Sequence, residues 1–422
     1  MRIMWVTFAP VGKASEIFYD RPTQSGGWVD ASMNALLPQL RTGEMQLDIV
    51  SLGESCRTVC DELTGVVYHM LALPRLRGKR NVAQAVPVWK ELLDKRRPDL
   101  IQIWGTEFTF GLDVMDAAGN IPVCCFIQGV MASLVAHPLG DISETYLMRQ
   151  LCITAYPKLW SLRKWRRIDA AQTTYEAQLA QRAAGLLVDS QWARGQYSQY
   201  TNKFYTVPLA ANQCFREKHW SLENCKKHSL FTVAGGADPQ KGVHDAVLAA
   251  AQLKRKYPDI RLYIPGSISY RRPHFLFDSI YIRHLRKLIE KNKLQENVVF
   301  VGAMSPEEMA QHMADANVFV MPSCVENHSS TLREAMTVGC PSISAAVGSG
   351  PELIETGKNG YLYRYHEEQT LAYYIDQLFS DDSLAQRFSM AGRIAVTEKY
   401  PQEKIGEMLR EAYTKILDES IK

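Results

Sequence analysis

Several features that define other protein classes are missing from this sequence of 422 residues. No apolar run reaches the ~18–20 residues that a membrane-spanning helix needs, so we expect no transmembrane segment. The net charge of +3 argues neither for nor against a nucleic acid partner. Because no aromatic-bearing RNA-recognition motif is present, we expect none. The nine cysteines lack the spacings of a zinc site, which favours reduced thiols in a cytoplasmic protein. The apolar start, Met1–Pro10, has no small-residue cleavage site after it, and we interpret it as a buried first strand.

The sequence also lacks low-complexity segments and short repeats, and its apolar residues fall instead into short runs. These runs alternate with longer amphipathic segments. Continuous hydrophobicity over four to eight residues is typical of strands buried on both faces, as in parallel sheets covered by helices. The predicted strands are Arg2–Phe8, Leu47–Leu52, Leu100–Gly105, Pro122–Gln128, Gly185–Ser190, Ser229–Gly235, Arg261–Ser267, Asn297–Gly302, Val318–Ser323 and Ser342–Ala346. Predicted helices include Trp28–Arg41, Asn81–Arg96, Val243–Lys256, Tyr281–Lys291 and Pro306–Asp315.

Two sets of about five strands predict an α/β protein with two doubly wound, Rossmann-like parallel-sheet domains. We place the first domain at 1–206, a polar linker at 207–228 and the second domain at 229–399. An amphipathic helix within 400–422 is expected to pack back on the first domain. Because ligands of open parallel sheets bind beyond the carboxyl ends of the strands, we expect the site in a central cleft between the domains.

Polar residues are concentrated in Glu326–Met336, "ENHSSTLREAM", directly after a predicted strand. If a helix starts here, the amides of Ser330, Thr331 and Leu332 point out of its positive end and form an anion site. Glu326 and Glu334 flank that anion site. Carboxylates repel a lone phosphate, but they accept hydrogen bonds from the sugar hydroxyls on both sides of a diphosphate, so this pattern favours a nucleotide sugar. The structural alternative is a capping box, in which Thr331 caps an amide and Glu334 reaches back.

Two glycine-containing turns also precede predicted helices. In Ala234–Val247 a strand ends at Gly235-Gly236, and Lys241 stands where its ammonium can reach a phosphate. In Ser25–Leu37, Gly26-Gly27 precedes a helix and would touch an interdomain ligand from the first domain. Each pattern is also typical of ordinary turns, and a lysine at such a position is often a solvated surface residue.

Taken together, these residues make the second half similar to the retaining glycosyltransferases of family 4, which have the GT-B fold. The matching pieces are Lys241-Gly242, Val301–Met309, the Glu-x7-Glu motif Glu326–Glu334, Glu334–Ile354 and Gly357–Tyr363. The first half matches more loosely at Gly26-Gly27, Pro98–Phe108, Cys125–Val130 and Arg182–Arg194. The variants "GTE" and "GGADPQKG" resemble those of enzymes that assemble polysaccharides and surface glycans.

The resemblance implies a role for each matching residue at a donor site. Glu326 would contact the donor sugar and act as the catalytic residue, and Glu334 would contact the ribose. Lys241 and the amides at Ser330, Thr331 and Leu332 would hold the diphosphate. The backbone near Met304 would line the base pocket, and Gly26 and Gly27 would approach the donor. Gln128 and Glu107 would orient the acceptor or the sugar.

Two positions depart from the family pattern. An arginine that commonly accompanies the lysine is replaced by Gly235-Gly236, and only Arg271 or Arg272 offers a substitute cation. The first-domain strand that often ends in His-Gly ends here in Gln128-Gly129, and a glutamine cannot act as a general base near neutral pH. With no strong nucleophile at that face, we expect front-face attack by the acceptor.

The sequence therefore predicts a retaining hexosyltransferase that moves a sugar from a UDP- or GDP-linked donor to a glycan or lipid-linked acceptor. No aspartate-rich metal motif follows a strand, so we expect no metal at the donor site and no further cofactor. Two alternatives stay open: a non-hydrolysing sugar-nucleotide epimerase and an inactive nucleotide- or glycan-binding protein. The basic runs Tyr156–Arg167, with two tryptophans, and Leu73–Arg80 suit either peripheral contact with the inner face of a membrane or a solvated surface.

Overall fold

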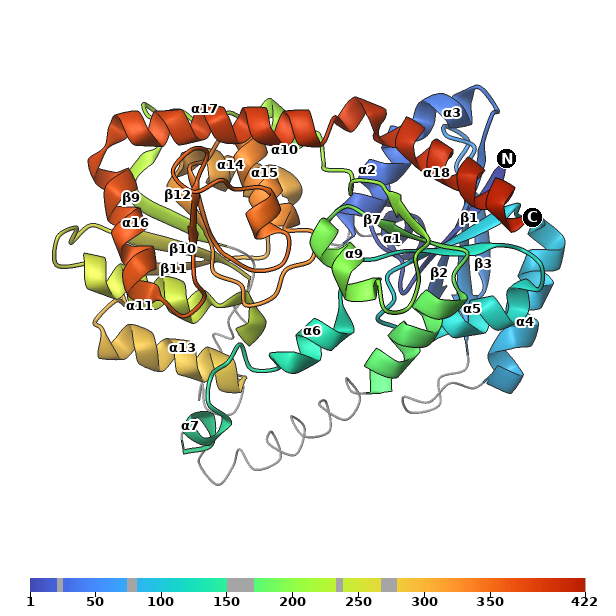
Figure 1. Ribbon diagram of the computed structural model, residues 1–422, viewed down its shortest axis with the longest axis horizontal. Coiled ribbons are helices and arrows are strands. Elements are labelled where there is room, and N and C mark those ends of the chain that lie inside the picture. Colours follow the sequence, from blue (N-terminus) through green and yellow to red (C-terminus); the bar gives the residue numbers. More distant parts are fainter. Residues whose placement is uncertain (21–25, 74–81, 150–170, 233–237, 267–278, 422) are drawn as a thin grey trace. The chain divides into compact units, whose positions relative to one another are not determined.

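The computed structural model describes residues 1–20, 26–73, 82–149, 171–232, 238–266 and 279–421 (Figure 1). The basic run at 156–167, most of the run at 73–80, Gly235-Gly236 and Arg271-Arg272 lie outside these residues. Chain contacts divide the molecule into two units. Residues 1–132, 167–211 and 400–422 form the first unit, and residues 133–166 and 212–399 form the second.

The first unit is built on an eight-stranded sheet with the strand order β3-β4-β2-β1-β5-β6-β7-β8. Every neighbouring pair is parallel except the β3–β4 hairpin at one edge. The strands are β1 (Arg2–Thr7), β2 (Gln46–Gly53), β3 (Arg57–Cys60), β4 (Val67–Ala72), β5 (Leu100–Trp104), β6 (Val123–Phe126), β7 (Gly185–Val188) and β8 (Phe204–Thr206). Successive side chains of β1 enter different cores: Ile3 and Trp5 join one cluster, while Met4 and Val6 join the other. This alternation explains why the strand reads as a continuous apolar run.

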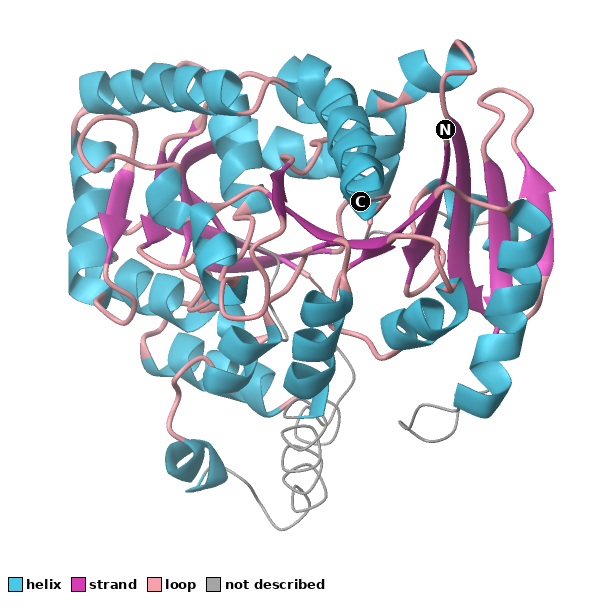
Figure 2. Cartoon of the chain, turned by 45° about the vertical axis from the view of Figure 1, so that its right-hand side comes forward, coloured by secondary structure: helices cyan, strands magenta, loops and turns pink. Residues whose placement is uncertain are grey.

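Helices cover both faces of the first sheet, as Figure 2 shows for the strands and helices together. The helices are α1 (Lys13–Tyr19), α2 (Gly27–Ala35), α3 (Leu37–Arg41), α4 (Val82–Arg96), α5 (Phe110–Ala118), a helix over 171–182, α9 (Gln191–Tyr197) and, near the carboxyl end, α18 (Ile405–Ser420). The single helix predicted over Trp28–Arg41 is two helices, because Pro38 has no N–H to continue the hydrogen bonding of α2.

The last helix packs on the first unit, as predicted from the sequence. In the structure α18 contacts α2, α3 and β8. Tyr413 is fully buried, accepts a hydrogen bond from the Trp5 indole at 3.0 Å and donates one to Gln102 at 2.6 Å. The residues that follow β8 are also part of this unit, where Val207, Leu209 and Ala210 join the same core cluster. Three strands distant in sequence from α18 therefore hold it on the first sheet.

The second unit has a six-stranded sheet, parallel throughout, with the order β11-β10-β9-β12-β13-β14. Its strands are β9 (Lys226–Thr232), β10 (Arg261–Pro265), β11 (Val298–Gly302), β12 (Ala316–Met321), β13 (Ser342–Ala345) and β14 (Tyr361–Tyr363). The predicted class, two doubly wound parallel-sheet α/β units, is confirmed, and all ten predicted strands are present. The strands β3, β8 and β14 were not predicted, because each has only three or four residues and is partly exposed. The strand β4 was also not predicted, although four of its six residues are buried.

Two groups of helices enclose this second sheet (Figure 1). One group contains α10 (Cys214–Glu217), α14 (Pro306–Asp315), α15 (Ser330–Val338) and α17 (Asp382–Lys399), and the other contains α11 (Val243–Leu253), α13 (Ile280–Lys291) and α16 (Glu368–Ser380). The short elements are η2 (Pro239–Lys241), η3 (Gly350–Glu352), α6 (Met131–Ala136), α7 (Glu144–Arg149) and η4 (Gln402–Lys404). Because the strands are parallel, the loops that follow them meet at one edge of the sheet.

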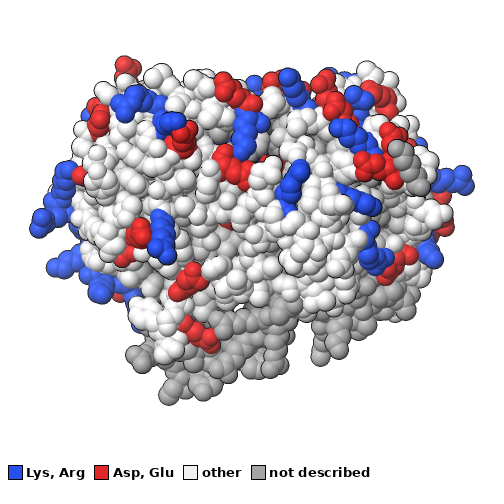
Figure 3. Space-filling model, in the orientation of Figure 1, with Lys and Arg blue, Asp and Glu red and all other residues white. Residues whose placement is uncertain are grey.

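Two further properties of the described residues bear on partners. None of their helices combines the length and apolarity that crossing a bilayer requires. On the face drawn in Figure 3, acidic and basic side chains are interspersed, and no broad field of one sign covers it. All eight cysteines in the described part of the chain are free thiols.

Candidate functional site

The start of α15 is built by an unusual backbone turn. Ser329, the residue before the helix, has a left-handed conformation with φ 45°, which non-glycine residues adopt at an energetic cost. Its hydroxyl makes no capping bond to the helix and instead accepts a hydrogen bond from the Ser349 hydroxyl at 2.9 Å. The helix therefore begins at Ser330, and the alternative capping box of Thr331 and Glu334 is wrong.

Three backbone amides at this helix start are available to a ligand. The first intrahelical bond runs from the Arg333 amide to the Ser329 carbonyl at 3.0 Å. Among the described residues, no acceptor lies within hydrogen-bonding distance of the amides of Ser330, Thr331 and Leu332. These amides also lie at the positive end of the helix dipole, which favours a bound anion. The predicted geometry of an anion site is thus present at α15.

Lys241 and Glu326 meet across two loops that follow neighbouring strands of the sheet. The Lys241 Nζ atom donates to Glu326 Oε1 at 2.6 Å. Burial disfavours the Lys241 ammonium, but the charge and hydrogen bond of Glu326 outweigh that effect and raise the pKa of the lysine. Lys241 is therefore a paired cation of the site rather than the solvated surface lysine of the alternative interpretation.

The loop after β13 fixes the backbone of Glu326. Gly348 has φ 53°, and a Cβ atom added to it would lie 1.5 Å from the Glu326 carbonyl oxygen. Only glycine permits this approach. Ser349, the next residue, makes the hydrogen bond to Ser329. Two adjacent residues of one loop thus set the positions of Glu326 and of the helix start.

Glu334 lies one turn into α15, and no hydrogen bond to its carboxylate is made by the described residues. Burial raises the pKa of this carboxyl from 4.5 to about 7, although the adjacent Arg333 guanidinium lowers it. A carboxylate kept partly dehydrated without a donor gains more than an exposed one from ligand hydroxyls. Met304 occupies the loop between β11 and α14, directly before the helix cap Ser305. All seven predicted residues of the second unit follow the carboxyl ends of its strands.

The predicted glycines of the first unit differ from each other. Gly26 has φ 88°, and a Cβ atom there would lie 2.3 Å from the Val11 Cβ atom, so packing alone requires glycine. Gly27 begins α2, and no atom lies within 4 Å of the position of its missing Cβ. Next to them, the Asp30 carboxylate accepts hydrogen bonds from the Lys13 amide at 3.0 and 3.1 Å, and burial raises the pKa of Asp30 to about 6. Asp30 belongs to none of the sequence motifs described above.

Glu107 and Gln128 lie together at the carboxyl ends of β5 and β6. The Gly129 amide donates to the Glu107 carboxylate. A Cβ atom on Gly105 would lie 2.2 Å from Glu107 Oε2 and 3.5 Å from Gln128 Oε1, so the two side chains share one small space. The prediction that these two residues act at one place is consistent with this geometry.

A buried carboxylate that no sequence motif indicated, Glu176, holds the loops that carry Glu107 and Gln128. Glu176, which is 2% exposed, accepts hydrogen bonds from the Tyr197 hydroxyl at 2.6 Å and the Met131 amide at 2.9 Å. Thr106 also donates to it at 3.3 Å. Burial raises the pKa of Glu176, and these donors partly offset the effect. Glu176 therefore ties the loop after β5 to the loop after β6, which carry Glu107 and Gln128.

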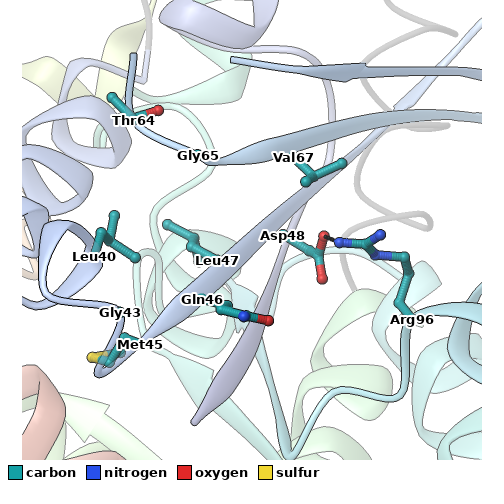
Figure 4. A pocket seen from close by; sticks show the side chains of 10 residues that line it. All are labelled: Leu40, Gly43, Met45, Gln46, Leu47, Asp48, Thr64, Gly65, Val67 and Arg96. Atoms are coloured by element: carbon teal, nitrogen blue, oxygen red, sulfur yellow. Dashed lines mark hydrogen bonds and ion pairs between the residues drawn. The ribbon is translucent and has the colours of Figure 1, made fainter. Parts of the chain in front are cut away.

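A pocket of about 360 Å³ lies at the opposite edge of the first sheet (Figure 4). It is lined at the amino ends of β2 and β4, and the Asp48 carboxylate there accepts a hydrogen bond from Arg96 at 2.6 Å. Ligands of open α/β sheets bind beyond the carboxyl ends of strands, where Glu107 and Gln128 lie. This pocket is therefore not part of the predicted site.

Comparison with known sequences supports the resemblance for the second unit. Residues 215–395 match the family model described as glycosyl transferases group 1. D-inositol 3-phosphate glycosyltransferase of Corynebacterium urealyticum is 31% identical over 179 residues, which cover 41% of this chain and 40% of that protein. WcaL of Salmonella typhimurium, named for a glycosyltransferase of colanic acid biosynthesis, is 30% identical over 178 residues, or 40% of this chain and 41% of that protein. These matches span about two fifths of the length of the relatives.

Solved structures resemble the whole chain. Sucrose-phosphate synthase of Thermosynechococcus elongatus superposes with a TM-score of 0.72 at 18% identity, covering 98% of both chains. HepE of Anabaena, in complex with UDP, superposes with a TM-score of 0.67 at 15% identity, covering 98% of this chain and 100% of that one. At such identities the likeness concerns the fold alone, and the predicted GT-B fold is confirmed.

Proposed function

We propose that this protein is a retaining glycosyltransferase that transfers a sugar from a nucleotide sugar to a glycan or lipid-linked acceptor in polysaccharide or surface-glycan assembly. The observation that carries the proposal is the start of α15, where three amides have no acceptor among the described residues. Glu326 and Glu334 flank these amides in the sequence, and Lys241 donates to Glu326. The group 1 match over 215–395 and the GT-B fold support it. HepE, which binds UDP, supports a nucleotide-linked donor.

In this proposal the second unit stabilises the leaving diphosphate. Negative charge grows on that group as the sugar becomes oxocarbenium-like, and the amides of Ser330, Thr331 and Leu332 would donate to it. Lys241 would add a full positive charge. Removing one such preorganised donor typically costs ~10²–10³ in rate. The charge on the leaving group is thus met by protein groups, and we propose that transfer needs no metal at the donor site.

Glu326 and Glu334 would hold the rings on either side of the diphosphate. Glu326 would accept hydroxyls of the donor sugar, and Glu334 would accept ribose hydroxyls. Such charge-assisted hydrogen bonds are about twice as strong as neutral ones. The base would lie against the backbone near Met304, as UDP or GDP. Gly26 and Gly27 would approach the same donor from the first unit.

Gln128 and Glu107 would orient the acceptor at the carboxyl edge of the first sheet. Gln128 carries no basic group, and the Glu107 carboxylate already accepts the Gly129 amide. We therefore propose front-face attack, in which the leaving phosphate takes the proton of the acceptor hydroxyl, rather than a covalent intermediate. The reaction would take place in the cytoplasm, and residues 156–167 would be the contact with a membrane that carries a lipid-linked acceptor.

The test begins with a panel of UDP- and GDP-linked sugars screened for thermal stabilisation. A ligand at ~100 times its dissociation constant adds about 2.7 kcal/mol to the free energy of unfolding. With the stabilising donor, Glu326→Gln should lower turnover at least ~10-fold with little change in nucleotide affinity, because a transition-state contact is lost. The matched control is Glu355→Gln, another glutamate paired with a lysine, Lys358, but exposed on the surface.

Three outcomes would contradict the proposal. An unchanged rate in Glu326→Gln would remove that residue from its role. Conversion of the nucleotide sugar to an epimer without any acceptor would favour an epimerase. Abolition of transfer by EDTA with rescue by Mn²⁺ would disprove transfer without a metal at the donor site.

A further inference from the structure

A cluster of two histidines and an aspartate lies at the start of α11 in the second unit, next to the turn that carries Lys241. His244 and Asp245 belong to the first turn of α11, which follows Lys241-Gly242, and His366 follows β14. One ligating atom from each of the three residues lies within 4.8 Å of the other two. The His366 Nδ1 atom is 3.2 Å and the His244 Nε2 atom is 3.7 Å from Asp245 Oδ1. His366 lies 121 positions after Asp245 in the sequence, and no sequence pattern indicates the cluster.

The Asp245 carboxylate is buried without a permanent cation. It is 1% exposed, and its partners among the described residues are the two imidazoles and the His366 amide, which donates to Oδ2 at 3.1 Å. No lysine or arginine of the described chain pairs with it. A buried carboxylate is costly unless it is paired or coordinates a metal. Among the described residues only a protonated imidazole can neutralise this carboxylate, and a bound cation would supply a permanent positive charge.

The surroundings of His244 orient one ring nitrogen toward that carboxylate. Its Nδ1 atom is 3.0 Å from the Tyr281 hydroxyl, on the side away from Asp245. A ligating histidine usually donates its other ring N–H to such a partner, which fixes the tautomer and leaves a lone pair for the metal. The Tyr365 hydroxyl, 3.5 Å from His244 Nε2, donates its proton to the Gly140 carbonyl at 2.7 Å. Nε2 is thus free to act as an acceptor.

We propose that His244, Asp245 and His366 bind one divalent transition-metal ion of the zinc type. Two imidazole nitrogens and one carboxylate suit Zn²⁺, Co²⁺ or Ni²⁺, whereas Mg²⁺ and Ca²⁺ prefer oxygen ligands. At the tetrahedral angle, two zinc bonds of ~2.0–2.1 Å place their ligand atoms about 3.3 Å apart. The two imidazole nitrogens already lie 3.2 and 3.7 Å from Asp245 Oδ1, so closing the site requires mainly that the half-exposed His366 ring and the His244 ring approach each other. Water completes the coordination.

The ion has a structural role, because it joins the start of α11 to the loop after β14. It holds the end of the turn that carries Lys241 and contributes no group to sugar transfer. The inference goes beyond the proposed function and does not rest on it. A chain that binds no nucleotide sugar can still bind the ion.

The test uses the full chain without a polyhistidine tag, treated with a chelator and then dialysed. Titration with Zn²⁺ should give one saturable site per chain and raise the melting temperature, while Mg²⁺ should do neither. Asp245→Asn and His366→Ala should weaken zinc binding by at least the ~10–100-fold that loss of an outer-sphere partner costs. The matched control is His228→Ala, which removes a histidine paired with Asp259 at 2.9 Å. Within the described part of the chain, no third ligand accompanies that pair.

A measurement on the unaltered protein keeps the test independent of how the variants fold. X-ray absorption at the zinc edge should show two imidazole ligands at the bound ion. Absence of saturable binding, or a bound ion without imidazoles, would overturn the proposal. Equal affinity in His366→Ala, with loss in His137→Ala, would instead assign binding to the exposed His137–Asp141 pair and would overturn it as well. UDP and GDP binding, measured on the chelated chain, reports separately on the donor site.

Discussion

Replacing Glu334 by glutamine should stabilise the second unit and impair its binding of the nucleotide. Burial raises the pKa of this carboxyl from 4.5 to about 7. Below pH 4.5 the carboxyl is protonated in both the folded and the unfolded chain, so it contributes no difference. Between pH 4.5 and 7 the Glu334 carboxyl is ionised in the unfolded chain but still protonated in the folded chain, so the free energy of unfolding falls as the pH rises. Above 7 the folded chain carries the full penalty.

The size of this penalty follows from the shift. At about 1.36 kcal/mol per pH unit, a pKa raised from 4.5 to about 7 corresponds to at most about 3 kcal/mol of destabilisation at pH 8. Glutamine has nearly the same shape and no charge, so Glu334→Gln removes the penalty. For a unit of this size the melting temperature should rise by at most roughly 6–12 °C at pH 8 and very little at pH 4.5.

Calorimetry of both proteins from pH 4.5 to 8 measures this effect and separates the transitions of the two units. Glu398→Gln, which changes an exposed glutamate on α17, is the control and should shift neither transition. Glu334→Gln should raise the melting temperature but weaken the binding of the nucleotide. Hydrogen bonds to charged groups are worth about 1.5–3 kcal/mol, so the variant should bind the preferred nucleotide roughly tenfold or more weakly at pH 8.

The pH dependence of binding provides a second reading of the same group. Affinity of the unaltered protein should fall as the pH drops through about 7, because the protonated carboxyl accepts ribose hydroxyls poorly. That dependence should disappear in Glu334→Gln. A variant that melts lower than the unaltered protein at pH 8 and binds nucleotide equally well would show that Glu334 serves the fold, and the reasoning would be refuted.

Two further substitutions test the supports of the sites. Gly348→Ala should abolish the thermal stabilisation by a nucleotide sugar, because the new Cβ atom would lie 1.5 Å from the Glu326 carbonyl oxygen. The control Gly357→Ala has φ 81° but open space around it, so it should only lower the melting temperature. Equal loss of binding in both variants would contradict the steric argument. Tyr197→Phe leaves the buried Glu176 without its 2.6 Å donor and should destabilise the first unit by about 1–3 kcal/mol, measured by calorimetry, and an unchanged transition would contradict the role assigned to Glu176.

Two segments with the same sequence pattern show where prediction from sequence stops. Ser305 and Glu308 fit the capping-box pattern, and the structure forms both of its hydrogen bonds. Thr331 and Glu334 fit the same pattern, yet the N-cap of α15 is Ser329, two residues earlier, and neither side chain caps the helix. The difference comes from Ser349, which lies twenty residues from Ser329 and binds its hydroxyl. A local pattern therefore predicts that a helix starts here, but a distant contact decides which amides it exposes.

The positions of the strands could be predicted because each strand is marked by a local run of apolar residues. Which distant segments pack together could not be predicted. Ten buried strands follow from continuous apolar runs alone. The second half of α6 and the residue after it belong to the second unit through contacts that no sequence pattern indicates. The Gln240 side-chain amide donates to the Leu134 carbonyl at 2.7 Å and to the His137 carbonyl at 3.2 Å. Asp245 and His366 likewise meet across 121 positions. Single polar contacts over such separations leave no periodicity in the sequence.

The ion pair of Lys241 and Glu326 suggests how the donor site manages with few cations. In the structure the two side chains neutralise each other at 2.6 Å. A free diphosphate that bound Lys241 would leave the Glu326 carboxylate without its partner and beside a second anion. A nucleotide sugar would replace both halves at once, because its phosphate takes the lysine and its sugar hydroxyls take the carboxylate. The pair lowers the cost of burying two charges and would then favour the intact donor over the released nucleotide. In the proposed site, the recognition of phosphate would thus be coupled to that of the sugar.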